Sequence, residues 1–245
     1  MAATAAKGEH FFSVSVQFAP QISFVTKLSE IAERVQREIN LPHWSSNSQS
    51  YDFFTKDNLL HVRIDHRRAV ILARSAEIWE DFRDKGLQLL VDVVGDYGLA
   101  EAVALEYRRD SLVDLGMTWA EMAALGLDAM FFAPEVLLDG PNDWTITLVR
   151  DLEGEQVRLV AAPMTQEMAI AHAKESASVT VLHDPAWSKN LNSLTEAIDS
   201  DRLLVQFTAT KRKLSKHDLA RIATKAEADS LQHIDRVVRK LKNQV

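Results

Sequence analysis

The sequence predicts an α+β protein in which antiparallel sheets carry helices packed on one face. Short runs of alternating apolar and polar residues are typical of half-buried strands, and longer segments repeat their apolar residues with helical spacing. The strands also follow one another without the regular strand–helix–strand order of a parallel sheet. A long amphipathic helix is expected at the C-terminus, where Leu219, Ile222, Ala226 and Ile234 share one stripe.

In the first half, Phe12, Val14 and Val16 alternate with polar residues, which predicts one buried face on the first strand. Ser75 is expected to cap a helix that Gly98 ends. The strands are expected over 11–18, 51–55, 59–64, 69–74 and 102–107, and the helices over 22–39 and 75–97.

In the second half, the spacings Thr118 to Glu121 and Ser215 to Asp218 match a helix-capping pattern. Strands are expected over 144–149, 156–161, 178–182 and 203–210, and helices over 118–126, 165–174 and from 215 onward. We expect a disordered N-terminus (1–10), an N-terminal lobe (11–115) and a C-terminal lobe (116–245). The similar order of elements in the two lobes is consistent with a structural duplication.

Composition narrows the classes of function. Hydrophobic residues make up 47% of the 245 residues, enough for a core, and cysteine is absent. The chain therefore has no disulfide, no cysteine-bound zinc and no thiol nucleophile, which suits a cytoplasmic location. No apolar run is long enough to cross a membrane, and the start of the chain lacks the apolar run of a signal peptide. Only eight glycines are present, without a phosphate-binding motif, so no cofactor is expected.

Charge is distributed unevenly. The formal net charge is −7, yet residues 211–245 carry ten Lys or Arg and four Asp or Glu, a net +6, which leaves about −13 elsewhere. Lys211, Arg212, Lys213 and Lys216 precede or begin the last helix, where the helix dipole does not favour cations. We therefore expect them to contact phosphate groups or an acidic partner, or else carboxylates of the same chain.

The pair Arg108 and Arg109 is expected to be exposed at the end of a strand. There it could bind an anionic ligand or partner, or else pair with the excess carboxylates of the same chain. A third hypothesis is a small-ligand sensor, with a cleft between the lobes lined by Trp44, Trp187 or Arg108.

An alternative function is a metal- or histidine-dependent phosphoester hydrolase or nuclease. On a strand, His61, Arg63 and Asp65 share one face and could supply acid–base chemistry, although the simpler interpretation is that they face water. His183 and Asp184 follow another strand, and His172 precedes them on a helix. Their spacing does not force them together, so no metal site is expected.

The residues Trp79-Glu80-Asp81-Phe82, then Leu87 to Val94, Tyr97, and Val103 to Arg109 resemble an uncharacterised, sporadically distributed family of bacterial proteins of similar length. The shared pattern is a Trp-x-x-Phe helix followed by an apolar-x-Tyr strand. Here Glu106 stands where a basic residue is expected, and Arg108-Arg109 replaces an apolar–Asn pair. The resemblance implies a cytoplasmic α+β protein and supplies no catalytic residues. Sporadic occurrence is similar to that of antiphage defence and toxin–antitoxin genes, which implies a partner-binding role.

Together these observations favour a non-enzymatic interaction module. It would bind a protein partner, with nucleic acid as the alternative, through the basic C-terminal helix and the exposed ends of the sheet. No membrane partner is expected, and the oligomeric state is open, a homodimer included.

Overall fold

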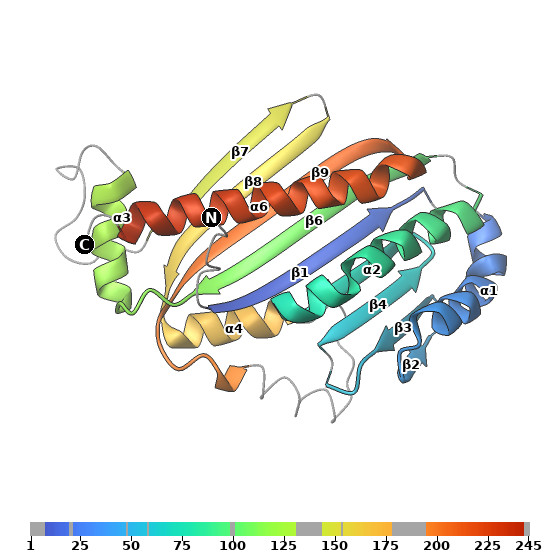
Figure 1. The fold of residues 1–245 in the computed structure, drawn as a ribbon, viewed down its shortest axis with the longest axis horizontal. Coiled ribbons are helices and arrows are strands. Elements are labelled where there is room, and N and C mark those ends of the chain that lie inside the picture. Colours follow the sequence, from blue (N-terminus) through green and yellow to red (C-terminus); the bar gives the residue numbers. More distant parts are fainter. Residues whose placement is uncertain are drawn as a thin grey trace.

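The computed structural model describes residues 8–19, 22–47, 49–57, 59–98, 101–130, 144–152, 154–177 and 195–242. Its framework is a nine-stranded antiparallel sheet with the strand order β2-β3-β4-β5-β1-β6-β9-β8-β7 (Figure 1). The strands are β1 (Gly8–Gln17), β2 (His43–Ser46), β3 (Ser50–Phe54), β4 (Leu60–Asp65), β5 (Arg68–Ala73), β6 (Glu101–Val113), β7 (Ile146–Leu152), β8 (Glu155–Met164) and β9 (Arg202–Ser215). The helices are α1 (Ile22–Ile39), α2 (Ala76–Asp96), α3 (Trp119–Met130), α4 (Gln166–Ala177) and α6 (Leu219–Lys242).

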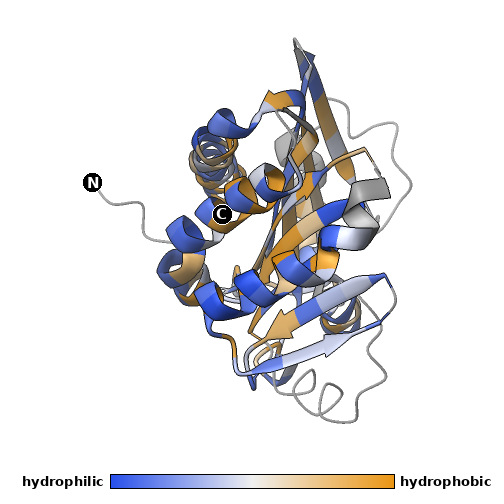
Figure 2. Ribbon diagram, turned by 90° about the vertical axis from the view of Figure 1, so that its right-hand side faces the viewer, coloured by the Kyte–Doolittle hydropathy of each residue, from blue (hydrophilic) through white to orange (hydrophobic). Residues whose placement is uncertain are grey.

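The helices divide between the two faces of the sheet. Helices α1, α2 and α6 lie on one side, which we call the helix face, and bury the large hydrophobic core against it (Figures 1 and 2). Helix α4 lies on the opposite side, which we call the polar face. There it covers a small apolar cluster that includes Phe11, Leu112 and Leu204. The short turn at Ile198 packs against the same cluster.

Strand β1 shows how the sequence produces this arrangement. Phe12, Val14 and Val16 are fully buried on the helix face, while Ser13 and Ser15 project to the polar face. On β5, Ile71 belongs to the same core, and a Cβ on Gly86 of α2 would lie 2.8 Å from its side chain. Glycine at position 86 therefore allows α2 to approach the sheet closely.

Trp79 joins three parts of the core. Its ring stacks on Phe12 of β1, with centroids 5.6 Å apart and planes within 4°, and meets Tyr107 of β6 edge-on. Its indole nitrogen donates a 2.8 Å hydrogen bond to Glu227 of α6, a carboxylate buried between α2, α6 and the sheet. Because the indole is itself fully buried, this bond satisfies both polar groups.

The predicted α+β class is confirmed: antiparallel strands, a face that carries α1, α2 and α6, and a long C-terminal helix. Helix α4, on the opposite face, is the departure from helices on one face. Helix α1 has the predicted bounds, and Ser75 caps α2 by accepting from Ile78 N at 3.1 Å. Thr118 and Glu121 form the expected capping box, with Glu121 Oε2 accepting from Thr118 N at 2.7 Å. The sheet runs without a break past the lobe boundary expected after residue 115, because β6 pairs with β9 along its length.

Four local predictions are corrected. The first strand begins at Gly8, within the segment expected to be disordered, because it pairs with Val113 on β6. Residues 43–46, expected in a loop, form edge strand β2. Strand β6 continues to Val113, six residues beyond its expected end. The cationic segment 211–213 is the end of β9, and a short 3-10 turn over Lys216–Asp218 separates it from α6. The strand expected over 178–182 lies outside the described residues.

In the described part of the chain, none of the helices combines the length and the apolar character that crossing a membrane requires.

We expect Trp79→Phe to lower the free energy of unfolding by about 1–3 kcal/mol, because the buried carboxylate of Glu227 loses its indole donor while most ring packing remains. Denaturant unfolding measures the change. Trp44→Phe, at an indole that is 54% exposed, is the matched control and should change stability little. Equal effects of the two substitutions would contradict the role given to the hydrogen bond.

Candidate functional site

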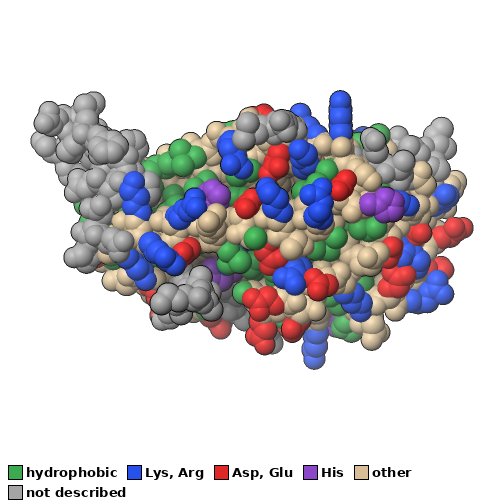
Figure 3. Space-filling view, turned by 45° about the horizontal axis from the view of Figure 1, so that its top comes forward, with side chains coloured by type: hydrophobic (Ala, Val, Ile, Leu, Met, Phe, Trp, Pro, Cys, Tyr) green, Lys and Arg blue, Asp and Glu red, His purple; other side chains and the backbone are tan. Residues whose placement is uncertain are grey.

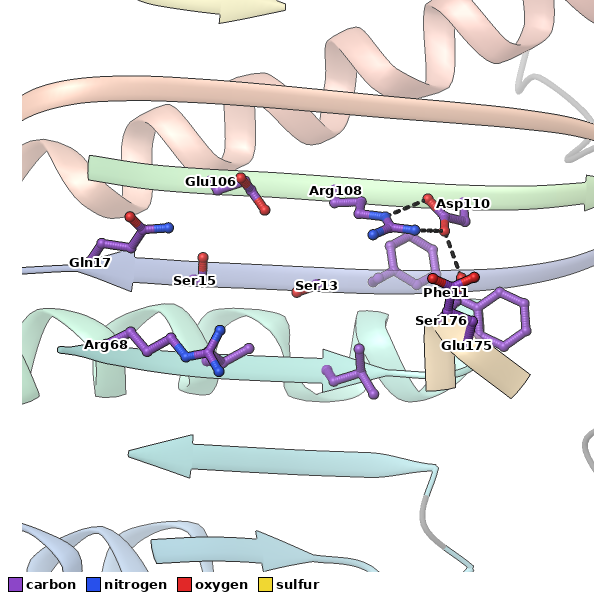
Figure 4. A pocket seen from close by; sticks show the side chains of 13 residues that line it. Phe11, Ser13, Ser15, Gln17, Arg68, Glu106, Arg108, Asp110, Glu175 and Ser176 are labelled. Carbon is purple, nitrogen blue, oxygen red and sulfur yellow. Dashed lines mark hydrogen bonds and ion pairs between the residues drawn. The ribbon is translucent and has the colours of Figure 1, made fainter. Parts of the chain in front are cut away.

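A hollow of about 250 Å³ is cut into the polar face over β5, β1 and β6 (Figure 4). Ser13 and Ser15 of β1 form its floor, together with Val70 and Leu72 of β5. Arg68 and Gln17 lie at one end, Glu106 and Arg108 stand along β6, and Glu175 and Ser176 of α4 close the other end.

Strand register explains why these residues meet. Ser13 lies opposite Leu72 on one side and Arg108 on the other, so the three form a row across the sheet. Ser15 forms the next row, with Val70 and Glu106. Opposed residues on antiparallel strands share a face, so short hydroxyl side chains on the central strand leave a trough between longer neighbours.

Asp110 anchors the end of the hollow beside α4. Its Oδ1 accepts from Arg108 Nε at 2.9 Å and Gln206 Nε2 at 3.0 Å. Its Oδ2 accepts from Arg108 at 2.5 Å, Ser176 Oγ at 2.9 Å and His172 Nε2 at 3.1 Å. The carboxylate therefore ties β6, β9 and α4 together.

The pKa of Asp110 reflects these contacts. Burial alone would raise it, but hydrogen bonds from His172 and Arg108 and the charge of Arg108 outweigh burial and hold the pKa well below its ordinary value. Asp110 is thus an ionised, fully occupied acceptor at neutral pH, which makes it a poor general base.

His172 and Ser176 do not complete a catalytic triad with Asp110. A triad needs the carboxylate on one ring nitrogen of histidine and the hydroxyl on the other. Here His172 Nε2 faces both Asp110 Oδ2, at 3.1 Å, and Ser176 Oγ, at 3.2 Å. The serine proton is directed at Asp110 instead, so the cluster orients side chains and has no geometry for activating a nucleophile.

A second polar network occupies the polar face over β3, β4 and β5. His61 Nε2 lies 2.8 Å from Asp52 Oδ1, and Arg63 lies 3.7 Å from the same oxygen. Asp65 forms ion pairs with Arg63, at 3.5 Å, and with Arg68, at 3.2 Å. His61, Arg63 and Asp65 share a face as expected, but the expectation that they face water is wrong: His61 is only 3% exposed and Asp65 is also buried. Burial lowers the pKa of His61, although its hydrogen bond to Asp52 acts in the opposite direction.

The two arginines predicted to bind a partner lie on opposite faces of β6. Arg108 lines the hollow, is partly exposed and pairs with Asp110. Arg109 was expected to be exposed, and this is wrong: it is 4% exposed on the helix face, with its guanidinium 4.9 Å from the centre of the Phe12 ring. Strand alternation separates the pair, so Arg109 is not accessible to a partner in this structure.

The cations 211–213 are also divided by strand alternation. Arg212 lies opposite Ala104 and so projects to the polar face, in line with Glu106 and Arg108. Lys211 lies opposite Leu105 and projects to the helix face, near Glu155, Arg221 and Lys225. Lys213 is exposed at the strand end. These three side chains therefore do not form one continuous patch.

Lys216 has a structural environment that its sequence position does not reveal. Its Nζ lies 3.8 Å from the place that a Cβ on Gly95 would occupy, at the C-terminal end of α2. Lys27 donates to Asp96 O there at 3.3 Å, and Arg34 pairs with the Asp96 carboxylate. Cations are favoured at the negative end of a helix dipole, so Lys216 has a reason to be there within the same molecule.

Several cations of α6 are neutralised by carboxylates of the same chain. Arg221 pairs with Asp218 at 2.7 Å and Arg239 with Asp235 at 2.7 Å. Lys225 contacts both Asp229 and Glu155. Figure 3 shows the result: basic and acidic side chains are interspersed over the helix-bearing side. The helix is basic in sequence, but much of its surface is mixed in charge.

The remaining predicted site residues divide into two groups. His183, Asp184 and Trp187 lie outside the described residues. Trp44 is exposed on edge strand β2, four strands away from β1, and so does not line the hollow. Among the described residues, no group of three or more His, Asp or Glu is placed to hold a metal ion.

Sequence reasoning missed Asp110, Gln206 and Ser176. The available signal was the alternation Glu106, Arg108, Asp110 against Tyr107, Arg109, Ser111, which continues a strand that we expected to end at Tyr107. Extending that strand would have placed Arg108 and Asp110 together. Ser176 of α4 reaches Asp110 through a tertiary contact, which no local sequence pattern predicts.

A comparison with protein-family models finds no match to the chain, and a comparison with curated proteins finds none.

We expect Asp110→Asn to lower the free energy of unfolding by about 1–3 kcal/mol at pH 7, because a charged acceptor of several hydrogen bonds is lost. The difference from the wild type should narrow as the pH falls below 3.8, the ordinary value for aspartate. A lowered folded-state pKa gives stability that is present above the unfolded value and is lost as the pH falls through the folded one. Denaturant unfolding between pH 7 and pH 2 tests this, with exposed Asp81→Asn as control. A pH-independent gap would contradict it.

The stability of the protein should also fall as the pH decreases below 6.5, the ordinary pKa of histidine. Because burial lowers the pKa of His61 in the folded state, the unfolded state binds the proton first as the pH falls, with a slope of up to about 1.4 kcal/mol per pH unit. Unfolding between pH 8 and pH 5 should show this slope in the wild type and a smaller one in His61→Gln, which retains a donor toward Asp52. His217→Gln, at an exposed histidine, should retain the wild-type slope. Parallel wild-type and His61→Gln profiles would disprove the assignment.

Proposed function

We propose that the protein is an interaction module that binds an extended segment of another protein in the hollow on the polar face. The observation that carries this proposal is the shape and lining of the hollow. It follows β1 from Phe11 to Gln17, six residue steps or about 20 Å at the spacing of a strand. A volume of about 250 Å³ over that length makes the hollow long and shallow. Such a shape suits an extended peptide better than a compact ligand.

The chemistry of the lining supports the same occupant. Hydroxyl and amide groups of Ser13, Ser15 and Gln17 lie along the floor, where they can bond to a peptide backbone. Val70 and Leu72 supply apolar contact. Glu106 and Glu175 place negative charge along the edges, and Arg68 and Arg108, each paired with an aspartate of this chain, add positive charge, which favours a partner with mixed charge.

The distribution of cations favours protein over nucleic acid as the partner. Nucleic-acid binding depends on cations that are available to neutralise phosphates. Here Arg221, Lys225 and Arg239 pair with carboxylates, and Arg109 is buried. Arg212 remains a candidate contact, since it lies on the polar face in line with the hollow. A place in a defence or toxin–antitoxin system stays a prediction of the sequence resemblance.

The test is a selection of peptides from a random seven-residue phage library, followed by fluorescence polarisation with the selected synthetic peptide. We expect Ser13→Tyr, which fills the floor, to weaken binding by about tenfold or more, a loss of about 1.4 kcal/mol. Thr208→Tyr is the matched control, because Thr208 lies in the same row on β9 but outside the hollow. It should bind as the wild type does.

Two results would overturn the proposal. One is that Ser13→Tyr and Thr208→Tyr bind the peptide equally well. The other is that no peptide is selected while a labelled oligonucleotide binds at low salt and loses affinity on reversal of Arg212 and Lys213, which would restore the nucleic-acid alternative.

A further inference from the structure

Strand β7 is the last described strand on one side of the sheet, so one row of its backbone groups faces away from β8 (Figure 1). Leu148 and Val149, at its centre, are 59% and 58% exposed. They project to opposite faces, since Leu148 lies opposite Leu159 of the core and Val149 opposite Arg158. An edge strand that exposes apolar residues on both faces is a template for pairing with another strand.

The opposite edge of the sheet is a weaker template. Strand β2 has four residues, whereas β7 has seven. Short edge strands are one of the devices that limit pairing between molecules. Strand β7 contains no proline, and its charged residues, Arg150 and Asp151, are neighbours of opposite sign.

The order of residues along β7 is suited to pairing with itself. Two copies that extend one sheet antiparallel are related by a twofold axis perpendicular to the sheet, and each residue on one side of the axis faces its mirror position on the other. Val149 is the midpoint of Ile146–Leu152, so an axis through Val149 pairs the whole strand. Both sheets then keep their helix faces on the same side.

The charges of β7 select among the possible axes. With the axis at Val149, Thr147 faces Asp151 of the second copy and Leu148 faces Arg150, so no like charges are opposed. An axis at Arg150 or Asp151 would place identical charges directly opposite each other, which is destabilising. An axis at Leu148 leaves part of the strand unpaired.

We infer that β7 is a homodimerisation edge, at which a second copy of this chain adds its own β7 antiparallel about Val149. The pairing joins the two sheets into one continuous sheet and covers Leu148 and Val149. The hollow is three strands away from β7, on β5, β1 and β6, so the dimer leaves it open.

The chain contains no cysteine, so a single introduced cysteine reports only contacts between molecules. Directly opposed residues of antiparallel strands have Cα atoms about 4.5–5.5 Å apart, within the range of a disulfide. We expect Val149→Cys to form a disulfide-linked dimer rapidly under mild oxidation. Leu148→Cys, which faces Arg150 in this register, and Leu231→Cys, an exposed apolar site on α6, should cross-link far more slowly.

Sedimentation velocity of the unmodified protein should show a dimer that dissociates on dilution. Val149→Lys, which opposes two ammonium groups at the axis, should give a monomer, and so should Val149→Glu. An equimolar mixture of these two variants should recover the dimer, because the introduced ammonium group of one copy then faces the introduced carboxylate of the other. Leu231→Lys is the matched control and should remain dimeric.

A wild-type protein that is monomeric at high concentration would overturn the inference. A dimer that survives Val149→Lys, or that cross-links through Leu148→Cys or Leu231→Cys faster than through Val149→Cys, would overturn it as well.

Discussion

The contact on which the structure depends most is the one between Trp79 and Glu227. A fully buried indole of α2 stacks on Phe12 of the central strand and donates to a buried carboxylate of α6. One side chain thereby fixes two helices, which are far apart in sequence, over β1 and β6. The Glu227 carboxylate also forms an ion pair with Arg83, at 3.6 Å, and interacts electrostatically with buried Arg109. It is therefore not an isolated buried charge.

Because α1, α2 and α6 pack on one side of the sheet, polar side chains of the central strands lie on the other side. Side chains alternate along a strand. The neighbours of each apolar residue on the helix face therefore point to the polar face. On β1 these neighbours are Ser13, Ser15 and Gln17, and on β6 they are Glu106, Arg108 and Asp110. The hollow is the consequence of two adjacent strands that place short and long polar side chains in the same rows.

Buried charge on the polar face is organised in two networks with different chemical properties. Around Asp110, hydrogen bonds from His172 and Arg108 outweigh burial and keep the carboxylate ionised. Around His61, burial outweighs the hydrogen bond to Asp52 and favours the neutral imidazole. Both groups contribute stability that decreases at acidic pH, but over different ranges, because their ordinary pKa values differ.

Local patterns in the sequence determined most of the elements. The helix over 22–39, the meander of β3, β4 and β5, the Ser75 cap and the Thr118–Glu121 capping box all follow from interactions within a few residues. The tertiary structure determined which groups the charged residues contact. The Asp201 carboxylate accepts from Trp119 N at 2.6 Å and Gln166 N at 2.9 Å, and so serves the first turns of both α3 and α4.

Lys216 shows the difference between what the sequence predicts and what the tertiary structure decides. By sequence it stands at the unfavourable end of its own helix dipole, which predicts a contact outside that helix, with an acidic partner or with carboxylates of the same chain. In the fold it lies at the favourable end of α2. The sequence by itself determined the fold class, the helix caps and the alternation of each strand. The order of the strands, the burial of Arg109 and His61, and the polar hollow were decided only in the tertiary structure, because they depend on contacts between residues tens to more than a hundred positions apart.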